Sequence, residues 1–205
     1  MKPFVFRPET GPWSSGASWL FVAILPDLDR DKGLAALVQG CREAMAGFPI
    51  DVVEDPALRV TLAQVSDVPS TEMDDAAREL LVGRLRERLG SVRPVEITAG
   101  SPLAYATGAL CDLEVEPLEE LVAAVRSTIR DVRGPAADTY ETGVIHMTLG
   151  YAHAAASTDD LARQLRRVRP SHARMHVDAV HLIEVSADAS TGFSWRSVAG
   201  IRLGV

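Results

Sequence analysis

The chain has 205 residues, of which 47% are hydrophobic and 24% are charged, and its formal net charge at pH 7 is -7. This composition is typical of a globular protein and excludes an intrinsically disordered chain. The negative charge disfavours binding along a nucleic-acid backbone, whereas a local pocket for a small anion is compatible with it.

The cysteines and the apolar runs indicate the compartment. Cys41 and Cys111 are the only cysteines and lie far apart, which excludes a cysteine zinc site and predicts two reduced, buried thiols. The apolar run over residues 19–25 is too short to span a bilayer, and three prolines interrupt the first twelve residues, where a signal peptide would need an apolar core. We therefore expect a cytoplasmic protein without a membrane segment, a metal or a cofactor.

The first half of the chain alternates strands with helices. After an irregular arm over residues 1–18, an apolar run stopped by Pro26 predicts a buried strand. An apolar stripe at helical spacing, an alternating strand and a helix capped by Ser70 follow. Gly100-Ser101-Pro102 predicts a turn between two further strands. The predicted elements are strand 19–25, helix 34–48, strand 58–65, helix 70–89 and strands 95–99 and 103–115.

The second half repeats this alternation. Pro117 is expected to begin a helix that ends at Gly134-Pro135, and Ser157 is expected to cap a helix that stops before Pro170. The last two strands predict a hairpin. The elements are helix 117–132, strand 144–151, helix 157–168 and strands 175–185 and 193–203. This order favours an α+β architecture in one domain over residues 1–205, with helices outside one or two antiparallel sheets.

Two segments of the chain resemble each other. Arg59-Val60-Thr61-Leu62 is similar to His146-Met147-Thr148-Leu149, and each precedes a Ser-Thr pair at the predicted start of a helix. Thr148 follows Thr61 by 87 residues, and Ser157 follows Ser70 by the same 87 residues (148 − 61 and 157 − 70). An echo that keeps its register through a loop indicates an internal duplication. The alternative is that a strand followed by a capped helix is simply a common unit.

A duplication has a geometric consequence, because related halves usually meet about a pseudo-twofold axis. Side chains two residues apart share one face of a strand. Arg59 and Thr61 would then face His146 and Thr148 across a central groove, while the residues between them enter the core. The sequence thus predicts a bilobal, pseudo-twofold duplicated α+β fold, with antiparallel sheets lining a groove and helices outside.

The four groove residues offer a defined chemistry. An imidazole can accept or donate a proton near pH 7, and threonine hydroxyls can donate to an oxyanion. Arg59 stays protonated and can hold phosphate oxygens with its fork of donors. The set suits a small phosphate ester or another small anion. Each residue also has a structural alternative: His146 as a core histidine, the threonines as strand formers and Arg59 as a surface charge.

These motifs resemble the two-histidine (2H) phosphoesterase superfamily, in its 2′-5′ RNA ligase and cyclic phosphodiesterase branch. The resemblance extends from about residue 19 onward and rests on segments 20–26, 58–62, 146–151 and 177–185. It implies a LigT-like fold and metal-independent cleavage or joining of 2′-linked or 2′,3′-cyclic phosphodiesters. It also implies that one histidine acts as the base, the other as the acid, and that paired hydroxyls hold the phosphate.

The sequence departs from this family at one position, because the first family histidine falls on Arg59, whereas the second falls on His146. Three interpretations stay open. The protein binds a phosphorylated ligand without turnover, His146 performs a single proton transfer while Arg59 holds charge, or another side chain has taken over the missing role. Tyr151 and His153 lie out of phase with His146 on an ideal strand. The candidates for the missing role are Tyr105, Tyr140, Tyr151 and His153.

The sequence therefore predicts a hydrolase-like protein that acts on a small phosphodiester, with an RNA end as a further substrate, and that works as a monomer. The alternatives are a phosphate binder without catalysis and an enzyme for other small-metabolite chemistry with His146 as its sole acid and base. The expected catalytic residues are His146, Thr148, Thr61 and Arg59, and the expected substrate-binding residues are Tyr151, Tyr105 and Trp13.

Overall fold

The structure is a computed structural model that describes residues 1–4, 17–141, 143–188 and 192–204. The strands are β1 (Ser18–Ile24), β2 (Ile50–Val52), β3 (Val60–Gln64), β4 (Val95–Tyr105), β5 (Gly108–Leu113), β6 (His146–Ala152), β7 (Ala173–Val177), β8 (Ala179–Asp188) and β9 (Gly192–Arg202). The helices are α1 (Lys32–Met45), α2 (Asp75–Leu89), α3 (Glu119–Arg133) and α4 (Thr158–Leu165). Four short 3₁₀ turns complete the secondary structure of these ranges: η1 (Asp55–Ala57), η2 (Ser70–Glu72), η3 (Glu116–Leu118) and η4 (Pro135–Asp138).

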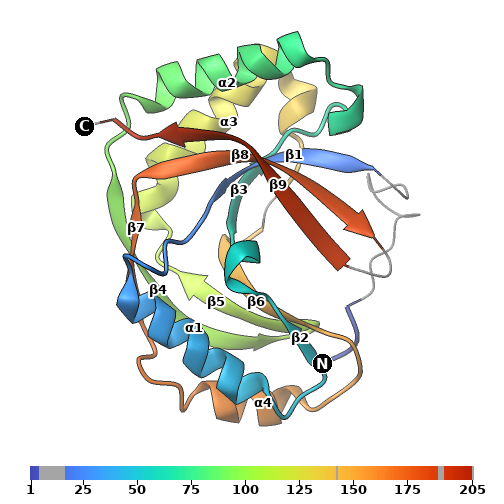
Figure 1. Cartoon of the computed structure of the whole chain (residues 1–205), viewed down its shortest axis with the longest axis vertical. Helices are drawn as coiled ribbons and strands as arrows, with labels where there is room; N and C mark the ends of the chain where they lie inside the picture. Colours follow the sequence, from blue (N-terminus) through green and yellow to red (C-terminus); the bar gives the residue numbers. More distant parts are fainter. Residues whose placement is uncertain (5–16, 142, 189–191, 205) are drawn as a thin grey trace.

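The described strands form one curled antiparallel sheet with β3 and β6 at its centre. The order is β7-β4-β5-β6-β3-β1-β8-β9, with β2 paired to β6. Helices α2 and α3 cover one half of the sheet, and α1 and α4 cover the other, at opposite ends of the view in Figure 1. We call these halves the α2/α3 lobe (β3, β1, β8, β9) and the α1/α4 lobe (β6, β5, β4, β7). The expected bilobal α+β fold is confirmed.

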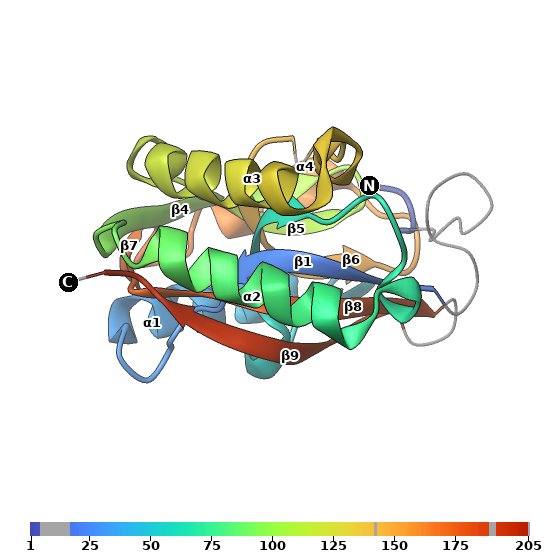
Figure 2. The same ribbon diagram turned by 90° about the horizontal axis from the view of Figure 1, so that it is seen from above.

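The chain crosses between the lobes in a symmetric way. Helix α1 follows β1 of the α2/α3 lobe but packs on α4 and β7 of the other lobe, whereas α3 follows β5 of the α1/α4 lobe and packs on α2 and β3. Figure 2 shows α2 and α3 on the same side of the sheet. Strand β4 comes from the first half of the chain and completes the α1/α4 lobe, whereas β8 comes from the second half and completes the α2/α3 lobe. The two halves of the sequence therefore share both lobes, as a pseudo-twofold duplication predicts.

The core explains why β1 is apolar on both faces. Leu20, Val22 and Ile24 are buried under the helices in the main hydrophobic cluster. The residues between them form a second cluster on the opposite face of the sheet, with Trp19, Phe21 and Ala23 from β1 and Val185 from β8. A strand buried on both faces reads as a continuous apolar run, which is how this strand could be predicted. Within the described residues, every helix is too short or too polar to span a bilayer.

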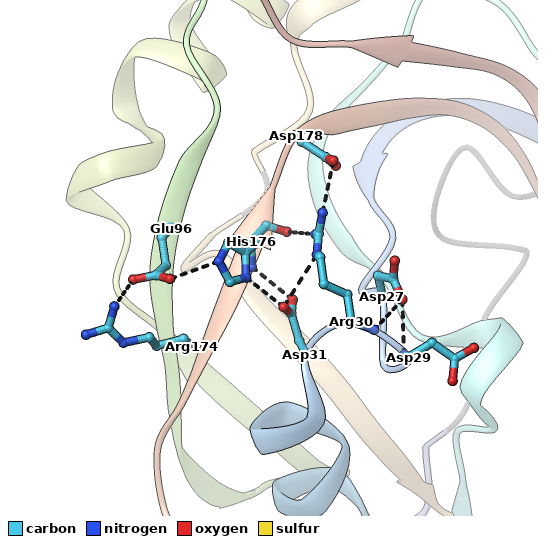
Figure 3. Close-up of polar contacts among 8 residues, drawn as sticks. All are labelled: Asp27, Asp29, Arg30, Asp31, Glu96, Arg174, His176 and Asp178. Atoms are coloured by element: carbon cyan, nitrogen blue, oxygen red, sulfur yellow. Dashed lines mark hydrogen bonds and ion pairs between the residues drawn. The ribbon is translucent and has the colours of Figure 1, made fainter. Parts of the chain in front are cut away.

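A polar cluster fixes the start of α1 against the edge of the sheet (Figure 3). The Asp31 carboxylate is almost fully buried and accepts hydrogen bonds from the backbone N–H of His176 at 2.9 Å and from its Nδ1 at 2.7 Å. Nε2 of His176 lies 3.0 Å from Glu96 on β4, and Arg30 bridges Asp31 and Asp178. Burial of the Asp31 carboxylate would cost free energy without these hydrogen bonds and ion pairs. The contacts therefore hold the start of α1 at the point where the chain crosses from one lobe to the other.

Two predicted elements are divided differently in the structure. Strand β4 continues through Gly100-Ser101-Pro102, which forms an irregularity in the pairing with β5, and the turn comes later, at residues 106–107. The predicted strand 175–185 is broken at Asp178, so that β7 pairs with β4 in one lobe and β8 pairs with β1 in the other. Both differences arise from strand pairing, which local sequence does not encode.

Candidate functional site

The two motif strands lie side by side at the centre of the sheet. β3 and β6 pair in antiparallel fashion through Val60 and Met147, both of which are fully buried. Thr61 and Thr148 are half-buried on the opposite face of the sheet. The predicted alternation between a core face and a groove face is therefore what the structure shows for these residues.

Each motif strand carries a β-bulge at its leucine. In the pairing of β1 with β3, Val22 faces Ala63 and Ala23 faces Thr61, so that Leu62 is the extra residue. In the pairing of β5 with β6, the register shifts from Gly150 to Thr148, so that Leu149 is the extra residue. The two leucines are 87 residues apart, the same separation as the motif threonines. A bulge at equivalent positions strengthens the case for duplication, because bulges are specific local features of a strand.

The second bulge corrects the argument against Tyr151. On an ideal strand, Tyr151 would face away from His146 and Thr148. The extra residue at Leu149 turns Tyr151 back to the groove face, where it is half-buried, while its neighbours Gly150 and Ala152 are buried. Tyr151 therefore faces the same side of the sheet as Thr148, and the expectation that it lies out of phase was wrong. His153 is exposed and does not line the cavity described next.

The groove contains a cavity of about 280 Å³. Six of the seven residues expected at the site line it: Arg59, Thr61, Tyr105, His146, Thr148 and Tyr151. The seventh, Trp13, lies outside the described residues. Sequence reasoning missed four aromatic or polar lining residues, namely Phe4, Phe21, Thr107 and Phe193, and it named Tyr140 only as a substitute for the absent histidine. The 87-residue offset pairs Phe21 with Gly108, another lining residue, so the repeat itself could have identified Phe21.

His146 is held in one tautomer by the backbone. Its Nδ1 lies 2.7 Å from the carbonyl oxygen of Val144, two residues earlier. A carbonyl can only accept, so Nδ1 carries the hydrogen and Nε2 of the neutral ring keeps its lone pair. Nε2 has no hydrogen-bond partner within the described residues, and the ring lines the cavity. His146 is thus arranged to accept a proton at Nε2.

Arg59 occupies the corresponding place in the other half. Its guanidinium reaches back to the carbonyl oxygen of Ala57, also two residues earlier, at 3.5 Å, and lies 5.9 Å from the centre of the Phe193 ring. Burial lowers the pKa of Arg59, an effect that Tyr151 and Tyr140 oppose. Arginine nevertheless stays protonated in proteins. No carboxylate among the described residues forms an ion pair with Arg59, so its charge is available to an anionic ligand.

The two motif threonines provide hydroxyl donors at the site. Neither Thr61 nor Thr148 has a side-chain hydrogen bond to another described residue, and both line the cavity beside Arg59 and His146. Across the ranges that the structure describes, no three His, Cys, Asp or Glu side chains are grouped as metal ligands. The arrangement can hold an anion between a cation and two hydroxyls, next to one proton acceptor.

Comparison with known proteins agrees with this geometry. A sequence model described as the 2′-5′ RNA ligase superfamily matches residues 60–189. No curated protein matches the sequence. The structure is similar to TT0787 of Thermus thermophilus, with 18% identity, a TM-score of 0.66 and coverage of 90% of this chain and 97% of that one. It is similar to E. coli LigT complexed with 3′-AMP (12% identity, TM-score 0.62, coverage 92% and 99%). It is also similar to LigT complexed with phosphate (14% identity, TM-score 0.58, coverage 93% and 100%).

Proposed function

Because the chain belongs to the 2′-5′ RNA ligase superfamily, the 2H phosphoesterases, we propose that it acts on a small phosphodiester in the groove between β3 and β6. The substrate class is a 2′,3′-cyclic or 2′-5′-linked nucleotide, or an RNA end that carries such a linkage. The observation that carries the proposal is one cavity that contains a cation without a carboxylate partner and an imidazole with an open Nε2, each next to a threonine hydroxyl.

Arg59 and the threonines bind the phosphate in this proposal. A guanidinium can donate two parallel hydrogen bonds to phosphate oxygens, and charge-assisted bonds of this kind are stronger than neutral ones. The half-buried position of Arg59 increases their strength, because the local dielectric constant is lower than in water. The hydroxyls of Thr61 and Thr148 would complete the anion site. The solved complexes of E. coli LigT with 3′-AMP and with phosphate support a ligand of this class.

His146 is the catalytic group in this proposal. With Nδ1 donating to Val144, Nε2 can accept a proton from water that attacks the phosphorus atom. In this proposal Arg59 takes the position of the family's first histidine, so that His146 supplies the one imidazole among the described residues of the cavity.

A second candidate function is a phosphate binder without turnover. The permanent charge of Arg59 at the position equivalent to His146 favours it, because arginine can hold an anion but cannot exchange a proton. Arg59→His separates the two. Restoration of the second histidine should raise turnover of a cyclic phosphate if the groove is a modified catalytic site, whereas a binder would lose affinity and gain no turnover.

The two cysteines bear on the proposed compartment. Cys41 and Cys111 are buried free thiols, and burial raises the pKa of each to about 12. Such thiols are compatible with the cytoplasm, which we propose as the location of a monomeric protein.

The first prediction concerns hydrolysis of 2′,3′-cyclic AMP. His146→Ala should lower kcat by about 10²- to 10⁴-fold, the usual effect of losing a general base, while calorimetry should still detect 3′-AMP binding. Arg59→Ala should weaken 3′-AMP binding by roughly 10- to 100-fold, because a charge-assisted hydrogen bond contributes about 1.5–3 kcal/mol.

Matched controls are available on the surface. His172→Ala and Arg163→Ala remove an exposed histidine and an exposed arginine away from the cavity, and both variants should behave as wild type. If wild-type protein binds 3′-AMP but turns over no cyclic or 2′-5′-linked substrate, the second candidate function, a phosphate binder without turnover, is correct. If it neither binds nor turns over these nucleotides, the groove has another ligand and the proposal fails.

A further inference from the structure

Hydrolysis of a phosphodiester requires two proton transfers, and the site as described supplies one. A proton leaves the attacking water, and a proton must reach the oxygen that departs from phosphorus. His146 can perform the first transfer. Arg59 cannot perform the second, because its guanidinium stays protonated. The inference below rests on the proposed function and concerns the group that supplies the second proton.

Tyr140 is placed on the Arg59 side of the cavity. It follows η4 and lines the same cavity as Arg59 and His146. Its ring meets Phe21 of β1 edge to face, with the ring centres 6.1 Å apart and an interplanar angle of 85°. The side chain is 38% exposed, and its hydroxyl has no hydrogen-bond partner within the described residues. A substrate in the cavity can therefore reach it.

The segment before Tyr140 is held firmly. Asp138, two residues earlier, has a buried carboxylate that forms ion pairs with Arg126, at 2.9 Å, and with Arg130 of α3. Because α3 is packed against α2 and β3, these contacts hold the segment that carries Tyr140 to the α2/α3 lobe. A proton donor must be positioned to within a fraction of an ångström to be effective, and this anchoring meets that requirement better than a free loop.

The surroundings of Tyr140 keep its hydroxyl protonated. Burial raises the pKa of Tyr140 above its ordinary value, the neighbouring Tyr151 raises it further, and the Arg59 cation acts in the opposite direction. The hydroxyl therefore carries its proton at neutral pH. Once the proton has left, the positive charge of Arg59 stabilises the phenolate.

We propose that Tyr140 is the proton donor to the leaving oxygen, in the role of the absent histidine. Nε2 of His146 takes a proton from water as the water oxygen bonds to phosphorus. The bond from phosphorus to one ribose oxygen breaks, and Tyr140 transfers its hydroxyl proton to that oxygen. The imidazolium then returns its proton to the phenolate through water, so that the net reaction consumes one water molecule.

The other two tyrosines of the cavity fit this role less well. Tyr151 packs its ring against Phe4 and Phe193, with centres 4.8 and 6.0 Å away, in an aromatic wall. Tyr105 is 59% exposed and has no electrostatic contact with Arg59 among the described residues. Tyr140 and Tyr151 both interact with the Arg59 cation, and Tyr140 adds a more exposed side chain and a preceding segment that Asp138 anchors to α3.

The test compares leaving groups. A ribose alkoxide is a poor leaving group that needs a proton, whereas 4-nitrophenolate leaves without one. Tyr140→Phe should lower kcat for 2′,3′-cyclic AMP by about 10²- to 10⁴-fold and should change kcat for bis(4-nitrophenyl) phosphate by no more than a few-fold. Tyr105→Phe removes a hydroxyl from the same cavity and should affect the two substrates alike. Thermal denaturation shows whether each variant is folded.

The outcomes separate this inference from the proposed function. If wild-type protein turns over both substrates and Tyr140→Phe slows both equally, or slows neither, then the proposed function stands and Tyr140 is not the donor. If wild-type protein turns over neither substrate, the catalytic function fails and the role of Tyr140 fails with it. A loss confined to the cyclic nucleotide establishes Tyr140 as the acid.

Discussion

Ser70 and Ser157 occupy equivalent positions in the two halves of the chain, yet their hydroxyls bind different partners. Ser157 caps α4 as predicted, because its side chain accepts the N–H of Asp160 at 3.2 Å. Ser70 does not cap α2. It begins η2, is fully buried, and donates its hydroxyl to the carboxylate of Glu184, whereas Asp74 caps the helix. The prediction for Ser70 was wrong because its hydroxyl donates a hydrogen bond to a buried carboxylate on β8, a strand far away in the sequence.

The hydrogen bond from Ser70 stabilises the ionised carboxylate of Glu184. Ser18 donates a second hydrogen bond at 2.9 Å, and Arg196 forms an ion pair with the same carboxylate. Burial acts to raise the pKa of Glu184, but the hydrogen bonds from Ser70 and Ser18 and the nearby arginines outweigh it, so the pKa lies below its ordinary value of 4.5. The ionised form is thus bound more favourably in the folded state than in the unfolded chain.

Glu184→Gln should lower the free energy of unfolding at pH 7 by about 1–3 kcal/mol, the cost of disturbing hydrogen bonds to a buried charge. The stabilisation is fully present above pH 4.5 and is lost as the pH falls through the lower folded-state pKa, so wild type and variant should converge in acid. Urea unfolding at pH 7 and at acidic pH measures the difference. Glu87→Gln, which removes an exposed helix ion pair, is the control and should change stability by less than about 1 kcal/mol. An equal difference at both pH values would contradict the argument.

At the scale of elements, the paired bulges decide what faces the groove. Without the extra residue at Leu149, Tyr151 would point into the core, and the cavity would lose its aromatic wall. The matching bulge at Leu62 gives Gln64 the position equivalent to Tyr151, but Gln64 is buried and does not line the cavity. The two halves therefore share the β-bulge but differ in the side chain that it positions, and this difference makes the site asymmetric.

At Gly108, the backbones of β5 and β6 lie too close together for a side chain to fit between them. It has a φ of +153°, and a Cβ at this position would lie 2.1 Å from the carbonyl oxygen of Gly150. Gly108→Ala should therefore destabilise the protein by at least about 2 kcal/mol, which lowers Tm by several degrees, and should reduce 3′-AMP binding by displacing Tyr151.

Gly200→Ala on β9 is the matched control, since a Cβ there meets only the His181 ring at 3.6 Å. Its Tm should stay close to that of wild type. Calorimetric melting of the two variants measures the effect, and an equal change in Tm for both would show that the contact with Gly150 is unimportant.

At the scale of the whole molecule, each half of the sequence contributes to both lobes. Strand β4 from the first half completes the α1/α4 lobe, and β8 from the second half completes the α2/α3 lobe. The polar cluster around Asp31 and His176 adds contacts between residues 145 positions apart in the chain. Neither half of the chain can bury its apolar faces without the other, which fits the expected single domain over residues 1–205.

We therefore predict one cooperative unfolding transition. Calorimetry should give a van't Hoff enthalpy equal to the calorimetric enthalpy, and a cut in the turn at residues 106–107 should yield fragments 1–106 and 107–205 that are each unfolded alone by circular dichroism. Mixing the two fragments should restore the fold. Two separate transitions, or one fragment that folds alone, would show that the lobes are independent units.

The sequence by itself determined the helices and most strands, the α+β class, the 87-residue repeat and the pairing of Arg59 and Thr61 with His146 and Thr148, because periodicity, caps and repeats are local properties. Only the tertiary structure decided that Ser70 donates to Glu184, that Tyr151 faces the groove and that Tyr140 lines the same cavity as Arg59. These features depend on strand register, bulges and contacts between segments far apart in the chain, where a shift of one residue turns a side chain to the other face.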